Sequence, residues 1–176
     1  MAPPKRWRPN GNRLTWTDPW GTGTATYDAQ DRLLTAGALT FTYTANGELL
    51  TRSENGQTDT FAYDALGNLR SATLADGLQI TYQLDALNRR LTTLVDGQPV
   101  QSFLYGDGPQ PLAELDGNGN VLSTFLYGTG NAPDALIQNG VTYRLIKDHL
   151  GSVRWVLNAV TGEVAQHLDH DAFGRV

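Results

Sequence analysis

A short unit recurs along the chain, and this repetition limits the possible folds more than any other feature of the sequence. The segment 63–77, YDALGNLRSATLADG, is echoed about twenty residues later by the segment 84–97, LDALNRRLTTLVDG. Self-similarity at a period of roughly 20 to 50 residues is typical of chains in which each repeat is one supersecondary unit packed on its neighbours. Seven copies align, and they begin at Trp7, Tyr27, Tyr43, Tyr63, Leu84, Leu115 and His170.

Each copy carries residues that are typical of a tight turn. Asp follows the first residue in five copies: Asp28, Asp64, Asp85, Asp116 and Asp171. Four residues after the start lie Gly11, Asp31, Gly47, Gly67, Asn88, Gly119 and Gly174, types that enter the left-handed region at little steric cost. The pattern predicts a type I turn with positive φ at its fourth residue, followed by a bulge that closes a β-hairpin. We predict that the Asp carboxylates accept backbone N–H groups, which is a structural role.

A second kind of turn lies between the copies. Asn-Gly and Asp-Gly pairs, a strong hairpin signal, separate apolar runs at Asn55-Gly56, Asp76-Gly77, Asp96-Gly97 and Asn139-Gly140. Between turns, apolar and polar residues alternate, so that Thr81 and Gln83 are expected on the more exposed face. The opposite face is predicted to bury the residues that open the copies: Trp7, Tyr27, Tyr43, Tyr63, Leu84 and Leu115.

These patterns predict an all-β fold in which antiparallel β-hairpin repeats form one continuous sheet, curled or spiralling. Nineteen Gly and abundant Thr, without an amphipathic helical pattern, favour strands and turns. Residues 1–6 are expected to form an N-terminal tail, and residues 7–105 the regular repeats. From 106 to 176 the repeats loosen around Gly- and Pro-rich loops, but the same sheet is expected to continue.

Charge and composition exclude several functions. A net charge of −5 and a pI of about 5.0 argue against a general nucleic-acid or anionic-membrane binder. The basic residues near the N-terminus are interpreted as a solvated tail. No window approaches about 18 apolar residues, so membrane insertion is not predicted, and the N-terminus lacks the apolar stretch of a signal peptide. Without Cys, neither a disulfide framework nor a thiolate zinc site can form.

Two polar clusters contain metal-ligand residue types, and each has a simpler explanation. In the cluster of His167, Asp169, His170 and Asp171, strand geometry points His170 away from the others, and His170 takes the first place of a repeat copy. The stretch 116–120, DGNGN, opens like a calcium loop. However, that loop needs Gly where Val121 stands and Glu where Tyr127 stands, so a turn is the better interpretation.

Two further groups were weighed as functional sites. Asp148, His149 and Ser152 lie within one tight turn, whereas the members of a catalytic triad converge from separate elements. The four Trp and seven Tyr could form a sugar-binding surface through ring stacking. Leu84 and Leu115 replace the ring at equivalent positions, which core packing tolerates and a stacking platform does not. No catalytic residue, metal site or cofactor is therefore predicted.

The hairpin repeats that begin with Tyr27-Asp28 and Tyr63-Asp64 resemble the YD-repeat, or Rhs-repeat, family. From about residue 105 the similarity tightens. The segments PLAELDGNGNVLSTFLYG, YRLIKDHLGSVRWVLNAVTGEV and LDHDAFGRV resemble the start of the Rhs-repeat-associated core. The resemblance marks DHLGSVR as a structural strand–turn–strand signature, with the motif residues Asp148, His149, Gly151 and Arg154.

In that family, the repeats wind as a continuous β-sheet into a hollow shell, which encloses a C-terminal toxin in bacterial Rhs and Tc-type proteins. Related shells occur in teneurin adhesion proteins. The resemblance implies a non-catalytic wall segment of a secreted or cell-surface protein, with a C-terminal toxin or the rest of the shell as partner. It places the family's plug, self-cleavage aspartates and toxin after Val176, so enclosure is expected of the parent architecture. The alternative is an adhesive module that binds carbohydrate or protein through aromatic side chains.

The ends of such a sheet are expected to associate. Terminal strands present N–H and C=O groups that lack neighbours, and such edges recruit other chains. We predict a homo-oligomer in which the terminal strands of one chain pair with those of the next, either in a closed ring or in a dimer.

Overall fold

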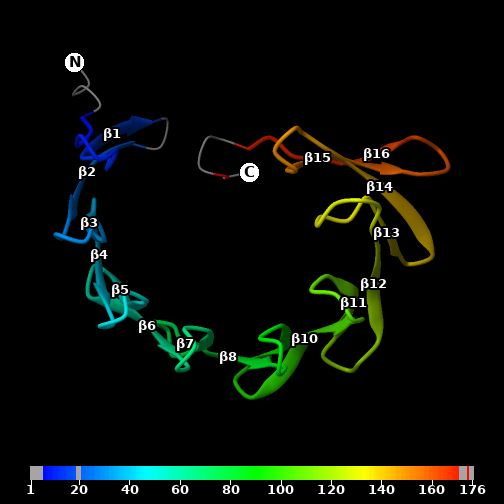
Figure 1. Ribbon diagram of the computed structural model, residues 1–176, viewed down its shortest axis with the longest axis horizontal. Coiled ribbons are helices and arrows are strands. Elements are labelled where there is room, and N and C mark those ends of the chain that lie inside the picture. The colour runs from blue at the N-terminus through cyan, green and yellow to red at the C-terminus, as the bar shows by residue number, and fades with distance from the viewer. Residues whose placement is uncertain (1–5, 19–20, 171–173, 175–176) are drawn as a thin grey trace. The chain divides into compact units, whose positions relative to one another are not determined.

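The computed structural model describes residues 6–18, 21–170 and 174, which form sixteen β-strands and no helix (Figure 1). The strands are β1 (Thr15–Asp18), β2 (Gly21–Tyr27), β3 (Leu33–Ala36), β4 (Leu39–Tyr43), β5 (Leu49–Glu54), β6 (Gln57–Tyr63), β7 (Leu69–Thr73), β8 (Gln79–Leu84), β9 (Arg90–Val95), β10 (Gln98–Tyr105), β11 (Pro111–Asp116), β12 (Val121–Leu126), β13 (Ala135–Gln138), β14 (Val141–Lys147), β15 (Val153–Asn158) and β16 (Val164–His167). Their order in the sheet is their order in the sequence. The predicted all-β fold of antiparallel hairpins is confirmed. Within the described ranges, no helix is long and apolar enough to cross a membrane.

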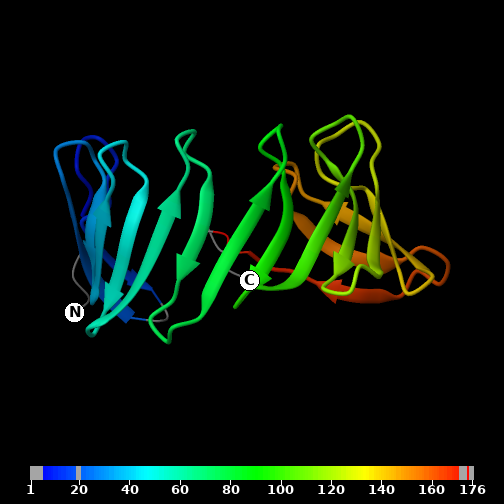
Figure 2. The ribbon, with the colours of Figure 1, turned by 90° about the horizontal axis from the view of Figure 1, so that it is seen from below.

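The chain divides into two compact units. Unit 1 comprises Met1–Tyr82 with Val95–Gly97, and unit 2 comprises Gln83–Leu94 with Gln98–Val176. Within each unit, strands contact the strands next to them in sequence, as the hairpins of Figure 2 show. The expected division into a tail, regular repeats over 7–105 and looser repeats from 106 remains a prediction.

Burial alternates along the strands, because successive side chains point to opposite faces of a sheet. In β8, Tyr82 and Leu84 are half-buried whereas Thr81 and Gln83 are exposed, as predicted. The most buried places are filled mainly by small residues: Ala25, Ala72, Ala113, Ser123 and Leu145. The residues predicted to open the copies on a buried face are half-buried, except Trp7, which is 53% exposed. The prediction is wrong for Trp7, which stands at the beginning of the described sheet and bridges to Arg13.

The predicted left-handed residues all have positive φ, and their values are Gly11 89°, Asp31 64°, Gly47 101°, Gly67 81°, Asn88 61°, Gly119 85° and Gly174 80°. Because Gly67 and Asn88 share this conformation, their exchange between copies follows from the backbone. Each of these turns is therefore defined by the backbone conformation of its fourth residue.

Hairpin turns form at all four predicted Asn-Gly and Asp-Gly pairs. Both residues have positive φ at Asn55-Gly56, Asp96-Gly97 and Asn139-Gly140, as a two-residue type I′ turn requires. At Asp76-Gly77 the hairpin turn is longer, because Gly77 alone of the pair has positive φ and its N–H donates to Leu74 O at 2.9 Å. Thr73 pairs with Gln79, so the turn runs from Leu74 to Leu78 and is of the longer kind.

Each unit has turns at two opposite ends of its strands, because consecutive connections of a meander alternate (Figure 2). We call one set the clasp edge: turns 8–11, 28–31, 44–47 and 64–67 in unit 1, and 85–88, 106–110, 127–134 and 148–151 in unit 2. The opposite edge has turns 37–38, 55–56, 74–77 and 96–97 in unit 1, and 116–119, 139–140 and 158–162 in unit 2. The turn that Asp116 begins thus lies at the opposite edge. The alignment of Leu115 with the other copies is therefore corrected, since a similar turn sequence occurs there in a different register.

Candidate functional site

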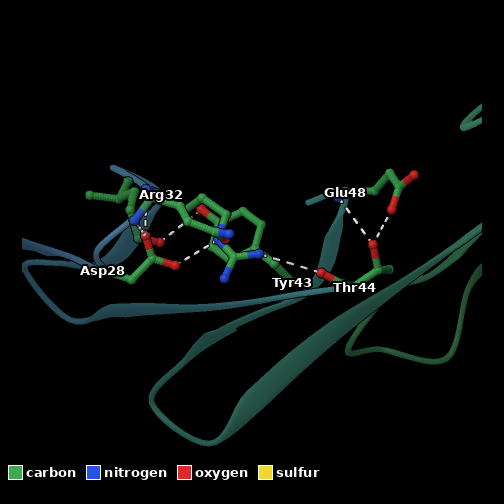
Figure 3. Close-up of polar contacts among 7 residues, drawn as sticks. Asp28, Arg32, Tyr43, Thr44 and Glu48 are labelled. Carbon is green, nitrogen blue, oxygen red and sulfur yellow. Dashed lines mark hydrogen bonds and ion pairs between the residues drawn. The ribbon is translucent and has the colours of Figure 1, made fainter. Parts of the chain in front are cut away.

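At the clasp edge of unit 1, the side chains of Asp28, Arg32 and Tyr43 form one connected group (Figure 3). Arg32 Nε donates to Asp28 Oδ2 at 2.6 Å, and the guanidinium lies over the Tyr43 ring, with its carbon 5.1 Å from the ring centroid. Arg32 Nη1 also donates to the backbone O of Thr44 at 3.4 Å. Asp28 and Thr44 begin neighbouring turns of this edge, so Arg32 ties one turn to the next.

The same group recurs in unit 2 with Asp85, Arg89 and Tyr105. Arg89 Nε donates to Asp85 Oδ2 at 2.7 Å, and its guanidinium carbon lies 4.7 Å from the centroid of the Tyr105 ring. Arg89 Nη1 donates to the backbone O of Gly106 at 2.8 Å and of Gly108 at 2.7 Å. The arginine therefore ties its own turn to the longer loop 106–110.

The turn aspartates accept backbone N–H groups, as predicted. Asp64 Oδ1 accepts from Leu66 N at 2.9 Å and from Asn68 N at 3.0 Å. The same two bonds form in the turns that begin at Asp28, Asp85, Asp116 and Asp148. Hydrogen bonds from the Asn68 side chain and from backbone N–H groups lower the pKa of Asp64. Asp171 lies outside the described residues.

Tyrosines of the clasp edge close the open ends of hairpins. Tyr43, the last residue of β4, donates its hydroxyl to the backbone O of Leu33, the first residue of β3, at 2.7 Å. The corresponding bonds run from Tyr27 to Arg13 O at 3.1 Å, from Tyr105 to Arg90 O at 3.0 Å and from Tyr127 to Pro111 O at 2.9 Å. Burial raises the pKa of Tyr43.

Two hairpins are closed by other residue types. Lys147, the last residue of β14, donates through Nζ to Ala132 O at 3.1 Å and to Asp134 Oδ1 at 2.7 Å. His170 Nε2 lies 3.1 Å from the O of Val153, the first residue of β15. A carbonyl oxygen only accepts, so Nε2 carries the proton in this contact. His170 therefore takes the place of the tyrosine, which is the place that the repeat alignment gives it.

Three hairpin-closing residues were missed by the sequence alignment: Tyr105, Tyr127 and Lys147. Gly rather than Asp follows the two tyrosines, and Lys147 is not aromatic although Asp148 follows it. The available signal was their spacing, since each lies about twenty residues from the next. A hydrogen-bond donor at a spacing of about twenty residues, rather than a Tyr-Asp pair, identifies the hairpin-closing position.

The DHLGSVR motif forms another turn of the clasp edge. Gly151 has a φ of 87°, and its N–H donates to Asp148 O at 3.0 Å, while His149 is exposed. Arg154 leaves the turn and pairs with Asp169, Nη2 to Oδ1 at 2.7 Å. The carboxylate of Asp148 accepts backbone N–H groups of its own turn, from Leu150 and Ser152.

In the polar cluster near the end of the chain, the side chains of His167 and Asp169 likewise contact other side chains. The His167 ring stacks on Trp155 with a centroid separation of 3.8 Å, and Asp169 is held by Arg154. In the part of the chain that the structure describes, no three His, Asp or Glu side chains are grouped as metal ligands would be. The groups at the clasp edge thus bind one another and the backbone.

Comparison with known proteins finds one matching family and long relatives. The model of the teneurin YD-shell family matches residues 6–176. The tRNA3(Ser)-specific nuclease WapA of Bacillus spizizenii is 26% identical over 170 residues, which cover 93% of this chain and 7% of that protein.

One solved structure of a toxin complex shares the fold, and another aligns less well. A Tc holotoxin pore of Photorhabdus luminescens aligns with a TM-score of 0.56 and 13% identity, over 87% of this chain and 12% of that one. A TcdB2-TccC3 complex aligns with a TM-score of 0.47 and 15% identity, over 85% and 11% of the two chains. The chain therefore spans only a small part of the proteins that it matches.

Proposed function

Because the chain belongs to the teneurin YD-shell family, we propose that it is a structural segment of the wall of a shell and has no catalysis of its own. The observation that carries this proposal is the clasp edge. At this edge Asp28, Arg32, Tyr43, Lys147 and His170 hold turns or close hairpins. Groups used in this way fix the shape of a sheet.

The geometry of the hairpin-closing position supports a scaffold over an enzyme. Tyr43, Lys147 and His170 share one task there, which is to donate a hydrogen bond across the open end of a hairpin. Catalysis demands a particular group with a particular pKa, and such an exchange of residue types would abolish it. WapA is named as a nuclease, but this chain covers only 7% of its length.

The partner that we propose is the rest of a shell or a C-terminal toxin. One solved relative is a complex of TcdB2 with TccC3, and another is a holotoxin pore, and each is far longer than this chain. The parent protein is then secreted or at the cell surface, as toxin and adhesion shells are. The strand edge at β16, whose four residues are exposed, is the place where the sheet would continue.

The alternative, an adhesive module that binds carbohydrate, receives less support from the rings. Arg32 covers one face of Tyr43, and Arg89 covers one face of Tyr105. Trp155, 39% exposed, is stacked on His167. Rings that are already covered offer a sugar little area for stacking.

Hydrogen exchange together with two binding assays tests the proposal. A wall segment should show slow exchange at the bonded turn amides of Leu66, Leu87 and Leu150. It should also give no saturable signal on a glycan array and leave tRNA intact. Glycan binding that Trp155→Ala abolishes would favour the adhesive module, and cleavage of tRNA would favour an enzyme.

A further inference from the structure

Five Asn-Gly pairs lie in turns of the described residues, and all five are exposed. They are Asn10-Gly11, Asn46-Gly47, Asn55-Gly56, Asn118-Gly119 and Asn139-Gly140. Such a pair is thermolabile, because the backbone nitrogen of the second residue can attack the side-chain amide of the first, and Gly has no Cβ to hinder the approach. Since the dipeptide and its exposure are the same at the five places, any difference in reactivity comes from the fold.

In three of the pairs, a hydrogen bond holds the glycine nitrogen in its turn. The N–H groups of Gly11, Gly47 and Gly119 each donate to the carbonyl oxygen of the residue three places earlier, at 2.9 to 3.1 Å. The nitrogen attacks only after it has lost this proton, so the hydrogen bond must break first, at a cost in free energy. At Asn10 the side-chain amide is held as well, because its Nδ2 donates to Asp31 Oδ1 at 2.6 Å.

The pairs Asn55-Gly56 and Asn139-Gly140 lack this restraint. Each forms a two-residue turn, and the backbone N–H of its glycine donates no hydrogen bond to any residue that the structure describes. The side-chain amides of Asn55 and Asn139 likewise make no hydrogen bond within the described ranges. At these two places, neither the attacking nitrogen nor the amide that it attacks has to leave a protein partner before the reaction.

The backbone conformation of the asparagine differs in the same direction. Ring closure places Cβ and the next nitrogen on the same side of the Cα–C bond, at a ψ of about −120°, which is the value at the first central residue of a type II′ turn. That residue has positive φ, and type II′ turns also close two-residue hairpins. Asn55 and Asn139 already have a φ of 51°, whereas Asn10, Asn46 and Asn118 do not have positive φ. The closed ring therefore fits the hairpin turn at Asn55 and Asn139.

We propose that Asn55 and Asn139 are sites of spontaneous deamidation in the folded protein. At the first site, Gly56 N forms a bond to Asn55 Cγ, the Cγ–Nδ2 bond breaks, and Nδ2 leaves as ammonia with the proton of Gly56 N. The product is a succinimide ring, which solvent water opens. Opening at Cγ gives aspartate, and opening at the main-chain carbonyl gives isoaspartate, in which the main chain runs through Cβ and Cγ. Gly140 N attacks Asn139 in the same way.

The two products should affect the hairpins differently. Aspartate is compatible with the turn, because Asp96-Gly97 already forms a two-residue turn with positive φ at both residues. Isoaspartate lengthens the main chain by one carbon in a turn of only two residues, and such a turn sets the register of its hairpin. We therefore expect isoaspartate at Asn55 to loosen the hairpin β5–β6, and isoaspartate at Asn139 to loosen β13–β14. The reaction does not depend on the proposed role as a shell wall.

Peptide mapping by mass spectrometry of the full chain, incubated in mildly alkaline buffer, tests the proposal. In the folded chain, Asn55 and Asn139 should convert about two- to tenfold faster than Asn46 and Asn118, the factor that corresponds to one net hydrogen bond. The chain unfolded in urea is the control, and there the pairs should convert at similar rates. Equal rates in the folded chain, or a difference that persists in urea, overturn the proposal.

Variants test the consequence for the hairpins. The urea midpoint of wild type should fall during incubation as isoaspartate accumulates. Asn55→Asp with Asn139→Asp supplies the aspartate product directly, so this double variant should keep its midpoint. Asn46→Gln is the matched control, since Gln30 occupies the same place in the neighbouring turn, and it should lose stability as wild type does. A wild type whose midpoint stays constant while isoaspartate accumulates, or a double variant that declines at the same rate, overturns the proposal.

Discussion

Tyr43, Lys147 and His170 differ in size, charge and aromatic character, yet each donates a hydrogen bond to backbone carbonyls near the start of a hairpin. At the scale of the residue, the repeat thus specifies a hydrogen-bond donor on a side chain long enough to bring that donor to the carbonyl. Leu84 lacks a donor altogether and is half-buried in its hairpin. Packing alone can therefore hold that position, and the hydrogen bond adds to it.

The hydroxyl of Tyr43 should contribute measurably to stability. Tyr43→Phe leaves the carbonyl of Leu33 without this donor, and we expect a loss of about 0.5 to 1.5 kcal/mol in the free energy of unfolding. Urea denaturation measures it. Tyr143→Phe is the control, because the Tyr143 hydroxyl makes no hydrogen bond with a described residue. Equal effects of the two changes would contradict the assigned role.

The left-handed backbone at Gly67 should resist a β-branched residue. Gly67 has a φ of 81°, and a Cβ there meets only Glu48 Oε1 at 3.5 Å, so the cost of Gly67→Val is backbone strain and not a clash. We expect about 1 to 2 kcal/mol of destabilisation, and much less for Gly67→Asn. Gly130→Val is the control, since a Cβ there meets nothing within 4 Å and its φ is not positive. Similar urea midpoints for the two valine variants would contradict the explanation of the destabilisation by backbone strain at Gly67.

The turn carboxylates should make stability depend on acid pH. The pKa of Asp64 lies below its ordinary value of 3.8, because Asn68 and backbone N–H groups bond to the charged form. A lowered pKa contributes stability that is present above the unfolded value and lost as pH falls through the folded value. Asp64→Asn keeps an accepting oxygen, as Asn158 does in its own turn. The variant should show a smaller fall in urea midpoint between about pH 5 and pH 2 than wild type, and an unchanged fall would contradict this account.

At the scale of the element, one turn reverses the usual arrangement of its polar pair. Asp28 and Arg32 occupy the first and fifth places of their turn, whereas Thr44 and Glu48 occupy those places in the next, with the hydroxyl donating to the carboxylate. The acid has moved from the first place to the fifth, and its carboxylate still accepts a hydrogen bond from the other residue of the pair.

A double-mutant cycle tests this reversal. Thr44→Asp alone sets two carboxylates side by side and should destabilise the turn. Adding Glu48→Arg restores the Asp28–Arg32 pattern and should recover most of the loss, with a coupling energy of about 0.5 to 3 kcal/mol. Urea denaturation of the four proteins gives the coupling, and additive effects would show that the two places act independently.

The hairpins could be predicted from the sequence because their turns depend on local conformation. Gly and Asn at left-handed positions, and Asn-Gly pairs between alternating runs, report the backbone directly. Asp76-Gly77 marks a hairpin turn as well, but a longer one, in which only Gly77 of the pair has positive φ. The alignment of Leu115 with the other copies was wrong, because a turn that begins with Asp can lie at either edge of the sheet. Consecutive turns alternate between the two edges. The edge at which a turn lies can therefore be assigned only by counting every connection that precedes it.

The site was harder to predict than the fold, because its contacts join residues of different hairpins or opposite ends of one hairpin. The bond of Arg32 to Thr44 O, and the three bonds of Lys147 to the loop before β13, depend on strand pairing and not on local pattern. Asp148 was identified from its motif, but Lys147 beside it was not, because it breaks the aromatic rule. The predicted burial of Trp7 was wrong for a related reason, since the sequence pattern does not show which strands will cover a residue.

At the scale of the whole molecule, the end of the sheet at β16 should associate by strand pairing. All four residues of β16 are exposed, and lysine on an edge strand opposes pairing with another chain. Val164→Lys with Gln166→Lys should reduce the self-associated species in sedimentation. Val160→Lys, in the neighbouring turn, should not. Unchanged large species in the double variant, or a wild type that is monomeric at 19.2 kDa, would contradict this prediction.

Among the described residues of each unit, strands contact only the strands next to them in sequence, and this has a consequence for how such a gene can change length. A hairpin can be duplicated or deleted as a stretch of about twenty codons, because the remaining hairpins keep the same two neighbours. The inserted copy needs a left-handed residue in its turn, and at its end a residue that packs as Leu84 does or also donates as Tyr43 does. Sheets of many sizes can therefore arise by recombination within one gene, without compensating mutations elsewhere.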